Sequence, residues 1–92
     1  MIKTFHSKQL ADLWSKGRTT GLGGKLQNRI LLHLDLLESA ERPKDVKLPG
    51  LEIRPLKGFD PVRYRLQVDT NCYLTFEFEQ GDASRIDFER EL

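Results

Sequence analysis

Cysteine, tryptophan and long apolar runs are scarce in this sequence, and two of these scarcities exclude whole classes of protein. Cys72 is the one cysteine among 92 residues, so the chain cannot form an internal disulfide or a cysteine-based zinc knuckle. No apolar run approaches the roughly 18 residues of a membrane span, and the N-terminus lacks an apolar stretch of the signal-peptide type. We therefore expect a cytoplasmic protein without a membrane segment, in which Cys72 is a small core residue rather than a reactive thiol.

Neither sign of charge dominates the composition. The sequence contains fifteen Lys and Arg residues and fourteen Asp and Glu residues, which gives a net charge of +1. This net charge does not by itself indicate a nucleic-acid-binding protein. Basic residues do gather locally, at positions 16–25 and again at positions 54–65. The second basic segment contains Arg54, Lys57, Arg63 and Arg65.

Helical periodicity marks the first half of the chain. Ser7 is a candidate N-cap, the apolar residues at 10, 13 and 14 recur at helical spacing, and Gly17 is placed to end this first helix. A longer helix is expected from residue 25 to about 40, and residues 1–5 are expected to form a short opening strand. His6 and His33 have no partner at zinc-site spacing, which favours ordinary surface or boundary histidines.

The second half changes to the period of two that is typical of strands. Apolar residues alternate with polar ones from about residue 51 onward, and turn residues fall at 57–61, 69–71 and 80–82. This pattern predicts an antiparallel meander of about four strands. With 38% hydrophobic residues, the chain can bury one modest core. We therefore expect one α+β domain spanning residues 1–92.

Strand register can be predicted because a one-residue slip would turn the apolar set to the wrong face. Odd-length hairpin loops satisfy the alternation, which pairs Val68 with Cys72 and Glu79 with Ala83. The neighbours expected on the polar face are Arg63, Glu77 and Arg85 in one ladder, and Tyr73 opposite Glu89. The ladder can be a solvated set of ion pairs. The alternative is an RNA-binding surface, since guanidinium groups match phosphates and Tyr73 can stack on a base.

A series of short motifs follows along the whole chain. The motifs are Met-Ile-Lys-Thr-Phe at 1–5, Lys-Gly at 16–17, Pro-Leu-Lys-Gly at 55–58, the turn at Asn71, Thr-Phe-Glu-Phe at 75–78 and Gly-Asp-Ala at 81–83. As an ordered set they resemble the HigB-type killer toxins of the RelE superfamily. The resemblance implies a RelE-like fold and a ribosome-dependent messenger-RNA endonuclease. It implies no metal or cofactor, and a helix-turn-helix antitoxin (HigA-like) as the silencing partner.

In such toxins the ribose 2′-hydroxyl attacks the adjacent phosphate, which requires a base, stabilising cations and an acid. Lys57 matches the lysine of the family's Leu-Lys-Gly motif. The resemblance therefore implies that Lys57 is a cation that stabilises the negative charge on the phosphate. The family commonly has Trp-Arg at 72–73, where this chain has Cys-Tyr, and ends Asp-Tyr-His, where this chain ends Arg-Glu-Leu. Arg54 replaces a histidine of some relatives. Arginine can bind phosphate, so Arg54 stays a candidate catalytic cation, but it cannot shuttle protons near neutral pH.

The candidate substitutes for these missing groups lie in the same two segments, around position 73 and at positions 89–91. Arg90 is a candidate for the cation lost at position 73, Tyr73 for the acid, and Glu89 or Glu91 for the base. The candidate RNA-binding residues are Arg63, Arg65, Arg85 and Arg90. Two other interpretations stay open: a HigB-like protein that binds RNA, the ribosome or an antitoxin without cleaving, and an unrelated α+β interaction domain.

Overall fold

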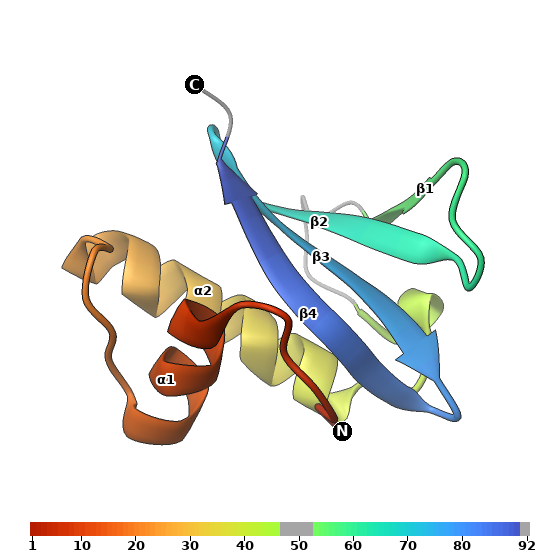
Figure 1. Cartoon of the computed structure of the whole chain (residues 1–92), viewed down its shortest axis with the longest axis horizontal. Coiled ribbons are helices and arrows are strands. Elements are labelled where there is room, and N and C mark those ends of the chain that lie inside the picture. Colours follow the sequence, from red (N-terminus) through yellow and green to blue (C-terminus); the bar gives the residue numbers. More distant parts are fainter. Residues whose placement is uncertain (47–52, 91–92) are drawn as a thin grey trace.

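The chain folds into two helices followed by a four-stranded antiparallel sheet (Figure 1). The structure, a computed structural model, describes residues 1–46 and 53–90. The elements are α1 (Lys8–Lys16), α2 (Gly24–Ser39), the 3₁₀ helix η1 (Pro43–Asp45), β1 (Ile53–Leu56), β2 (Arg63–Asp69), β3 (Cys72–Glu79) and β4 (Asp82–Arg90). Neighbouring strands follow chain order, β1-β2-β3-β4. The predicted α+β class and four-stranded meander are confirmed.

Both helices begin and end close to where the sequence signals place them. The Leu10 backbone N–H donates to the Ser7 side chain at 3.3 Å, so Ser7 caps α1. Gly17 adopts a φ of 78° and its N–H donates to the Leu13 carbonyl, which ends the helix in the left-handed conformation that glycine tolerates best. Helix α2 begins one residue before the predicted start.

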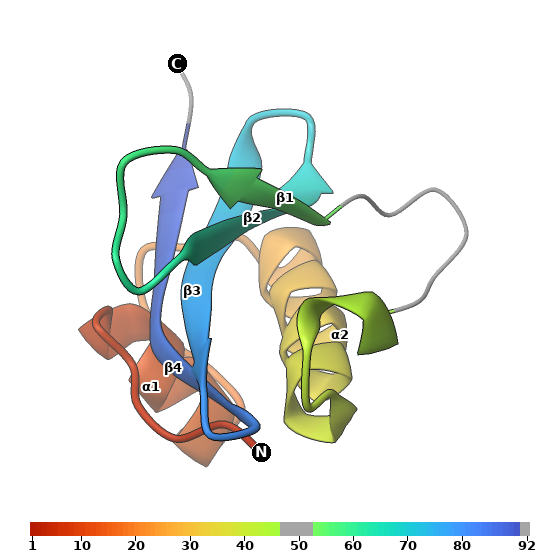
Figure 2. The same ribbon diagram turned by 90° about the vertical axis from the view of Figure 1, so that its right-hand side faces the viewer.

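The core lies between the helices and one face of the sheet (Figure 2). Its fully buried larger side chains are Leu10, Leu13, Ile30, Leu34, Leu37, Leu66, Leu74, Phe76 and Ile86. His33 is 6% exposed and its Nδ1 lies 2.6 Å from the Arg29 carbonyl, so the expectation of a surface or boundary histidine is wrong. The apolar face of α2 is wide enough to include position 33, so the His33 side chain is buried in the interior.

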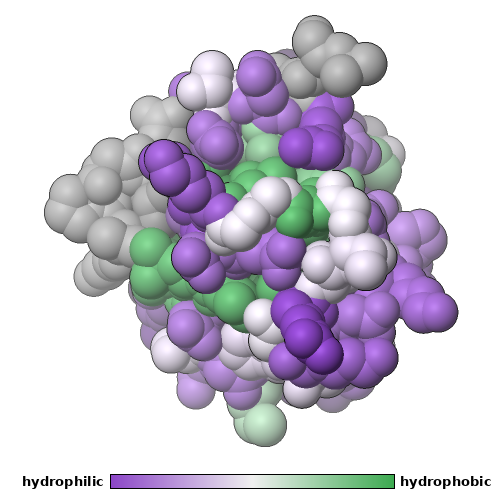
Figure 3. All heavy atoms as spheres, turned by 90° about the vertical axis from the view of Figure 1, so that its left-hand side faces the viewer, coloured by the Kyte–Doolittle hydropathy of each residue, from purple (hydrophilic) through white to green (hydrophobic). Residues whose placement is uncertain are grey.

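The helix side of the molecule is covered mainly by hydrophilic side chains, with hydrophobic ones visible in places between them (Figure 3). Four large hydrophobic residues of the described segments are exposed: Met1, Leu32, Phe59 and Val62. Two of these, Phe59 and Val62, belong to the loop between β1 and β2. In the described part of the chain, no helix combines the length and apolar character needed to cross a bilayer.

The opening strand predicted for residues 1–5 does not form. Ile2 and Phe5 instead make isolated parallel bridges to Ala83 and Ile86 of β4. Between these two bridges Arg85 adopts a φ of 49°, which interrupts the regular ladder that a strand requires. The N-terminal segment is nevertheless tied to β4, because backbone hydrogen bonds link the two at both bridges.

The hairpin loops differ from the predicted odd lengths. Asp69 pairs with Cys72 and Glu79 with Asp82, so both loops contain two residues and the pairings expected for Val68 and Ala83 are wrong. Each hairpin contains a register shift, one between Gln67 and Asp69 and one between Thr75 and Glu77. A bulge adds one residue to one strand, which restores the parity that an odd loop would have provided. The pairing of Tyr73 with Glu89 is confirmed.

The prediction that Cys72 is a core residue is confirmed, since it is 2% exposed. Burial raises the pKa of its thiol from 9.0 to about 11, while the charge of Arg90 opposes part of this shift. We expect a thiol reagent at pH 8 to label the native protein slowly and the urea-unfolded protein fast. Labelling at equal rates in both states would contradict the burial of this side chain.

The same shift predicts a loss of stability at alkaline pH. The unfolded thiol releases its proton from about pH 9, whereas the folded thiol keeps it until about pH 11, so the free energy of unfolding falls across this window. Urea unfolding at pH 8 and pH 10.5 measures the loss. Cys72→Ala serves as the control, because its smaller loss reports the other titrating groups alone.

Candidate functional site

The face of the sheet opposite the helices carries rows of polar side chains. Directly paired residues on neighbouring strands share a face, so the pairings Arg54 with Arg65, Arg65 with Thr75, and Thr75 with Asp87 place these side chains in one row across all four strands. Tyr73 and Glu89 form a second pair on the same face. Strand β1 contributes Arg54 and Leu56 to this face, because Leu56 pairs with Arg63.

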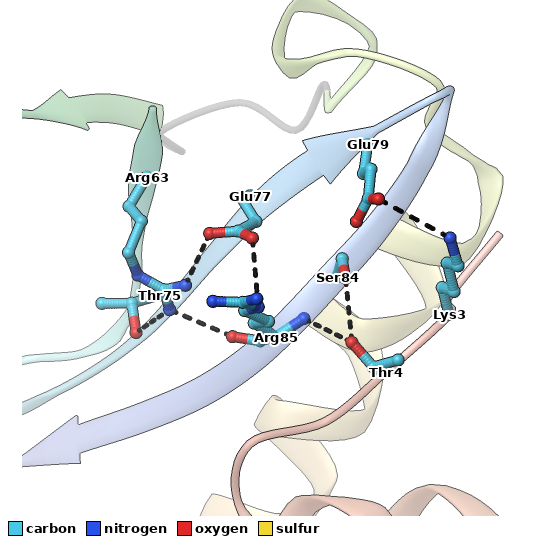
Figure 4. A network of polar contacts seen from close by, with 8 residues as sticks. All are labelled: Lys3, Thr4, Arg63, Thr75, Glu77, Glu79, Ser84 and Arg85. Carbon is cyan, nitrogen blue, oxygen red and sulfur yellow. Dashed lines mark hydrogen bonds and ion pairs between the residues drawn. The ribbon is translucent and has the colours of Figure 1, made fainter. Parts of the chain in front are cut away.

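A cluster around Glu77 organises the middle of this face (Figure 4). Arg63 donates from one nitrogen to Glu77 at 3.1 Å and from the other to the Thr75 hydroxyl and the Arg85 carbonyl, both at 3.0 Å. Arg85 Nε lies 3.5 Å from the second oxygen of Glu77. The predicted contacts of Glu77 with Arg63 and Arg85 are confirmed, although Ser84 and not Arg85 is its partner in the register.

The two arginines of this cluster differ in exposure. The side chains of Arg63 and Glu77 are 16% and 6% exposed, whereas that of Arg85 is 71% exposed. Arg63 uses both terminal nitrogens within the protein and therefore supports the site. Arg85 keeps most of its guanidinium in contact with solvent, so it is the cation of this pair that can approach a bound phosphate.

The N-terminal segment holds the backbone of Arg85 in place. The Arg85 N–H donates to the Thr4 hydroxyl at 2.8 Å, and that hydroxyl lies 2.8 Å from the Ser84 hydroxyl (Figure 4). A positive φ is uncommon for a residue other than glycine. It persists where surrounding contacts determine it, and bulges of this kind redirect a side chain. The bulge thus turns Arg85 toward the polar face.

Tyr73 is held between a carboxylate and a guanidinium. Its hydroxyl donates to Glu89 at 2.7 Å. The guanidinium carbon of Arg65 lies 3.9 Å from the centre of its ring, at cation–π distance, and Arg65 also donates to Gln67 at 3.1 Å. The hydroxyl and one face of the ring are therefore already engaged by the protein.

The same face of the sheet contains a cavity of about 410 Å³. It lies on the polar face between β4 and the loop that follows β1. Two arginines and two carboxylates contribute to its wall, together with aromatic, polar and apolar groups. The residues that line it are His6, Leu56, Phe59, Arg63, Tyr73, Thr75, Arg85, Asp87 and Glu89.

Four of the sequence-predicted site residues line this cavity: Arg63, Tyr73, Arg85 and Glu89. Lys57 lies in the loop between two further lining residues, Leu56 and Phe59. It is exposed and makes no hydrogen bond or ion pair within residues 1–46 and 53–90. Arg54 and Arg65 lie on the same face of the sheet, beyond the cavity wall.

Two predicted residues are not brought into this group. Arg90 pairs with Cys72, whose side chain is in the core, so the register places Arg90 on the face opposite to Tyr73 and Glu89. Glu91 lies outside the described residues. Within those residues, no three His, Cys, Asp or Glu side chains gather as a metal-binding group.

Sequence reasoning missed His6, Phe59 and Asp87 as lining residues. The alternation along β4 could have identified Asp87, because it shares a face with Arg85 and Glu89. No local signal could have identified His6. Its place in the cavity depends on the bridge between Phe5 and Ile86, which joins residues far apart in the chain.

Two helices packed on one face of a four-stranded antiparallel sheet form an α+β arrangement that is consistent with a RelE-like fold. No family model matches the chain. The chain is 32% identical over 89 residues to the Endoribonuclease HigB of Proteus vulgaris, an alignment that covers 97% of each protein. This chain therefore belongs to the HigB family, as its motifs indicated.

Proposed function

We propose that this chain is the toxin of a type II toxin–antitoxin system and that it cleaves messenger RNA on the ribosome. The observation that carries the proposal is the similarity to an endoribonuclease over nearly the full length of both chains. The cavity supports it, because cations and groups able to transfer protons meet there on one face of the sheet. A ribosomal substrate would place this activity in the cytoplasm.

The residues of the site match the demands of RNA cleavage by the 2′-hydroxyl. This reaction needs cations where negative charge develops on the phosphate. Arg85 is an exposed cation in the cavity wall, Lys57 is an exposed cation in the loop that contributes Leu56 and Phe59 to that wall, and Arg54 extends the positive charge along β1. The reaction also needs a proton acceptor, and the carboxylate of Glu89 in the cavity wall can take that role.

The partner implied by this function is a helix-turn-helix antitoxin that silences the toxin. Neither a metal ion nor an organic cofactor is required by the proposed chemistry, because the nucleophile belongs to the RNA itself.

Expression of the chain with and without the neighbouring antitoxin gene tests the proposal. We expect growth arrest without the antitoxin, and new messenger 5′ ends that appear only while the messenger is being translated. Purified protein should cut a messenger programmed in ribosomes and leave the same naked RNA intact. Normal growth and intact messenger in cells that contain folded protein would refute the proposal.

A second candidate function is binding without cleavage. It is favoured by the contacts of Tyr73 and Arg63, whose polar groups are engaged within the protein, and by the register that turns Arg90 away from the cavity. A chain of this kind would bind the ribosome or the antitoxin and leave messenger intact. The cleavage assay above separates the two functions directly.

A further inference from the structure

The N-terminal segment brings a histidine to the cavity. Phe5 bridges to Ile86, and the His6 backbone N–H donates to the Ile86 carbonyl at 2.8 Å. The next residue, Ser7, donates to the same carbonyl and caps α1. His6 is therefore fixed on both sides, and its exposed side chain lines the cavity together with Asp87 of the adjacent strand.

Among the lining residues, few can donate a proton to a leaving group. Arginine stays protonated in proteins, so Arg63 and Arg85 can stabilise charge but cannot transfer a proton. The Tyr73 hydroxyl already donates to Glu89 at 2.7 Å. Ionised Asp87 and Glu89 only accept. The ring of His6 makes no hydrogen bond or ion pair within the described residues, and imidazole can give and take protons near neutral pH.

We infer that His6 is the general acid of the cleavage reaction, an assignment that rests on the proposed function. The Glu89 carboxylate takes the proton of the 2′-hydroxyl as its oxygen bonds to phosphorus. The bond from phosphorus to the 5′-oxygen breaks, and the His6 imidazolium gives its proton to that oxygen. The products are a 2′,3′-cyclic phosphate and a 5′-hydroxyl. Water then returns a proton to His6 and takes one from Glu89.

The surroundings of His6 are compatible with this role. The charged or titratable groups that share its cavity are Arg85, Asp87 and Glu89 from β4, Arg63 from β2 and Tyr73 from β3. Asp87 follows Ile86, the residue that anchors the His6 backbone, and the side chains of Asp87 and His6 both line the cavity. A carboxylate beside an imidazole can accept its N–H and orient the ring. Exposed Arg85 lies on the other side of Ile86, where it can hold the phosphate.

A substrate with a better leaving group tests the assignment. Ribosome-bound messenger is prepared with an ordinary phosphate at the cleavage site, or with sulfur in place of the bridging 5′-oxygen. A thiolate leaves without protonation, so a general acid is not needed for the second substrate. We expect His6→Ala and His6→Gln to cut the ordinary messenger about 100-fold more slowly than the unchanged protein. We expect both variants to cut the sulfur-containing messenger at nearly the unchanged rate.

The matched control is Lys8→Ala, which removes an exposed side chain close in the sequence and outside the cavity. It should cut both messengers at the unchanged rate. Unimpaired cleavage of ordinary messenger by the two His6 variants, or an equal loss on both messengers, would overturn the role of His6 while leaving the proposed function intact. If the unchanged protein cuts neither messenger, the proposed function fails, and this assignment fails with it.

Discussion

Replacement of Arg63 by alanine is expected to lower the free energy of unfolding by about 3 kcal/mol. Arg63 is 16% exposed and binds Glu77, which is 6% exposed, at 3.1 Å. Without the arginine, the Glu77 carboxylate stays largely buried and keeps, among residues 1–46 and 53–90, one charged partner, the exposed Arg85. The Arg85 carbonyl also loses the donor that supports the bulge. Urea unfolding at neutral pH measures the loss.

Two variants isolate the cause of this effect. Arg85→Ala removes the other cation of the cluster, but its side chain is 71% exposed, so we expect a loss of about 1 kcal/mol or less. Arg63→Met combined with Glu77→Leu removes both buried charges and should recover much of the stability lost in Arg63→Ala. Equal losses in Arg63→Ala and Arg85→Ala would show that burial does not control the strength of these pairs.

Replacement of Lys57 by alanine is expected to reduce messenger cleavage by about 100- to 1000-fold, the usual effect of removing one group that stabilises transition-state charge. Lys57 is exposed and lies between two residues that line the cavity. Since it makes no hydrogen bond or ion pair within the described segments, its removal should change stability by less than about 0.5 kcal/mol. Cleavage rates on translating ribosomes, measured beside a thermal melt, check both expectations.

The control for Lys57 is another exposed lysine. Lys44 lies in η1, away from the cavity wall, and Lys44→Ala should cleave at the unchanged rate. Lys57→Arg keeps the positive charge and should retain part of the activity. Cleavage by Lys57→Ala at the unchanged rate would contradict the proposal that Lys57 stabilises the charge on the phosphate. It would also favour another cation, such as Arg85, in that role.

The elements of the fold could be predicted where the signal is local. Ser7 and Gly17 delimit α1 because capping depends on residues a few positions apart. The alternation in β2 to β4 identified the strands and their buried faces. The loop lengths were wrong because a bulge and an odd loop produce the same alternation, so a pattern of side chains cannot distinguish them. The opening strand failed because its ladder is interrupted at Arg85.

The features of the candidate site also divide into those that the sequence predicts and those that depend on tertiary packing. The sequence by itself determined the α+β class, the resemblance to HigB-type toxins, and the contacts of Glu77 with Arg63 and Arg85. Only the tertiary structure decided which face Arg90 occupies, how Tyr73 is held, and that His6 joins Asp87 and Glu89 around one cavity. The reason is physical: periodicity reports which side of its own strand a residue faces, whereas a cavity depends on which distant segments pack together.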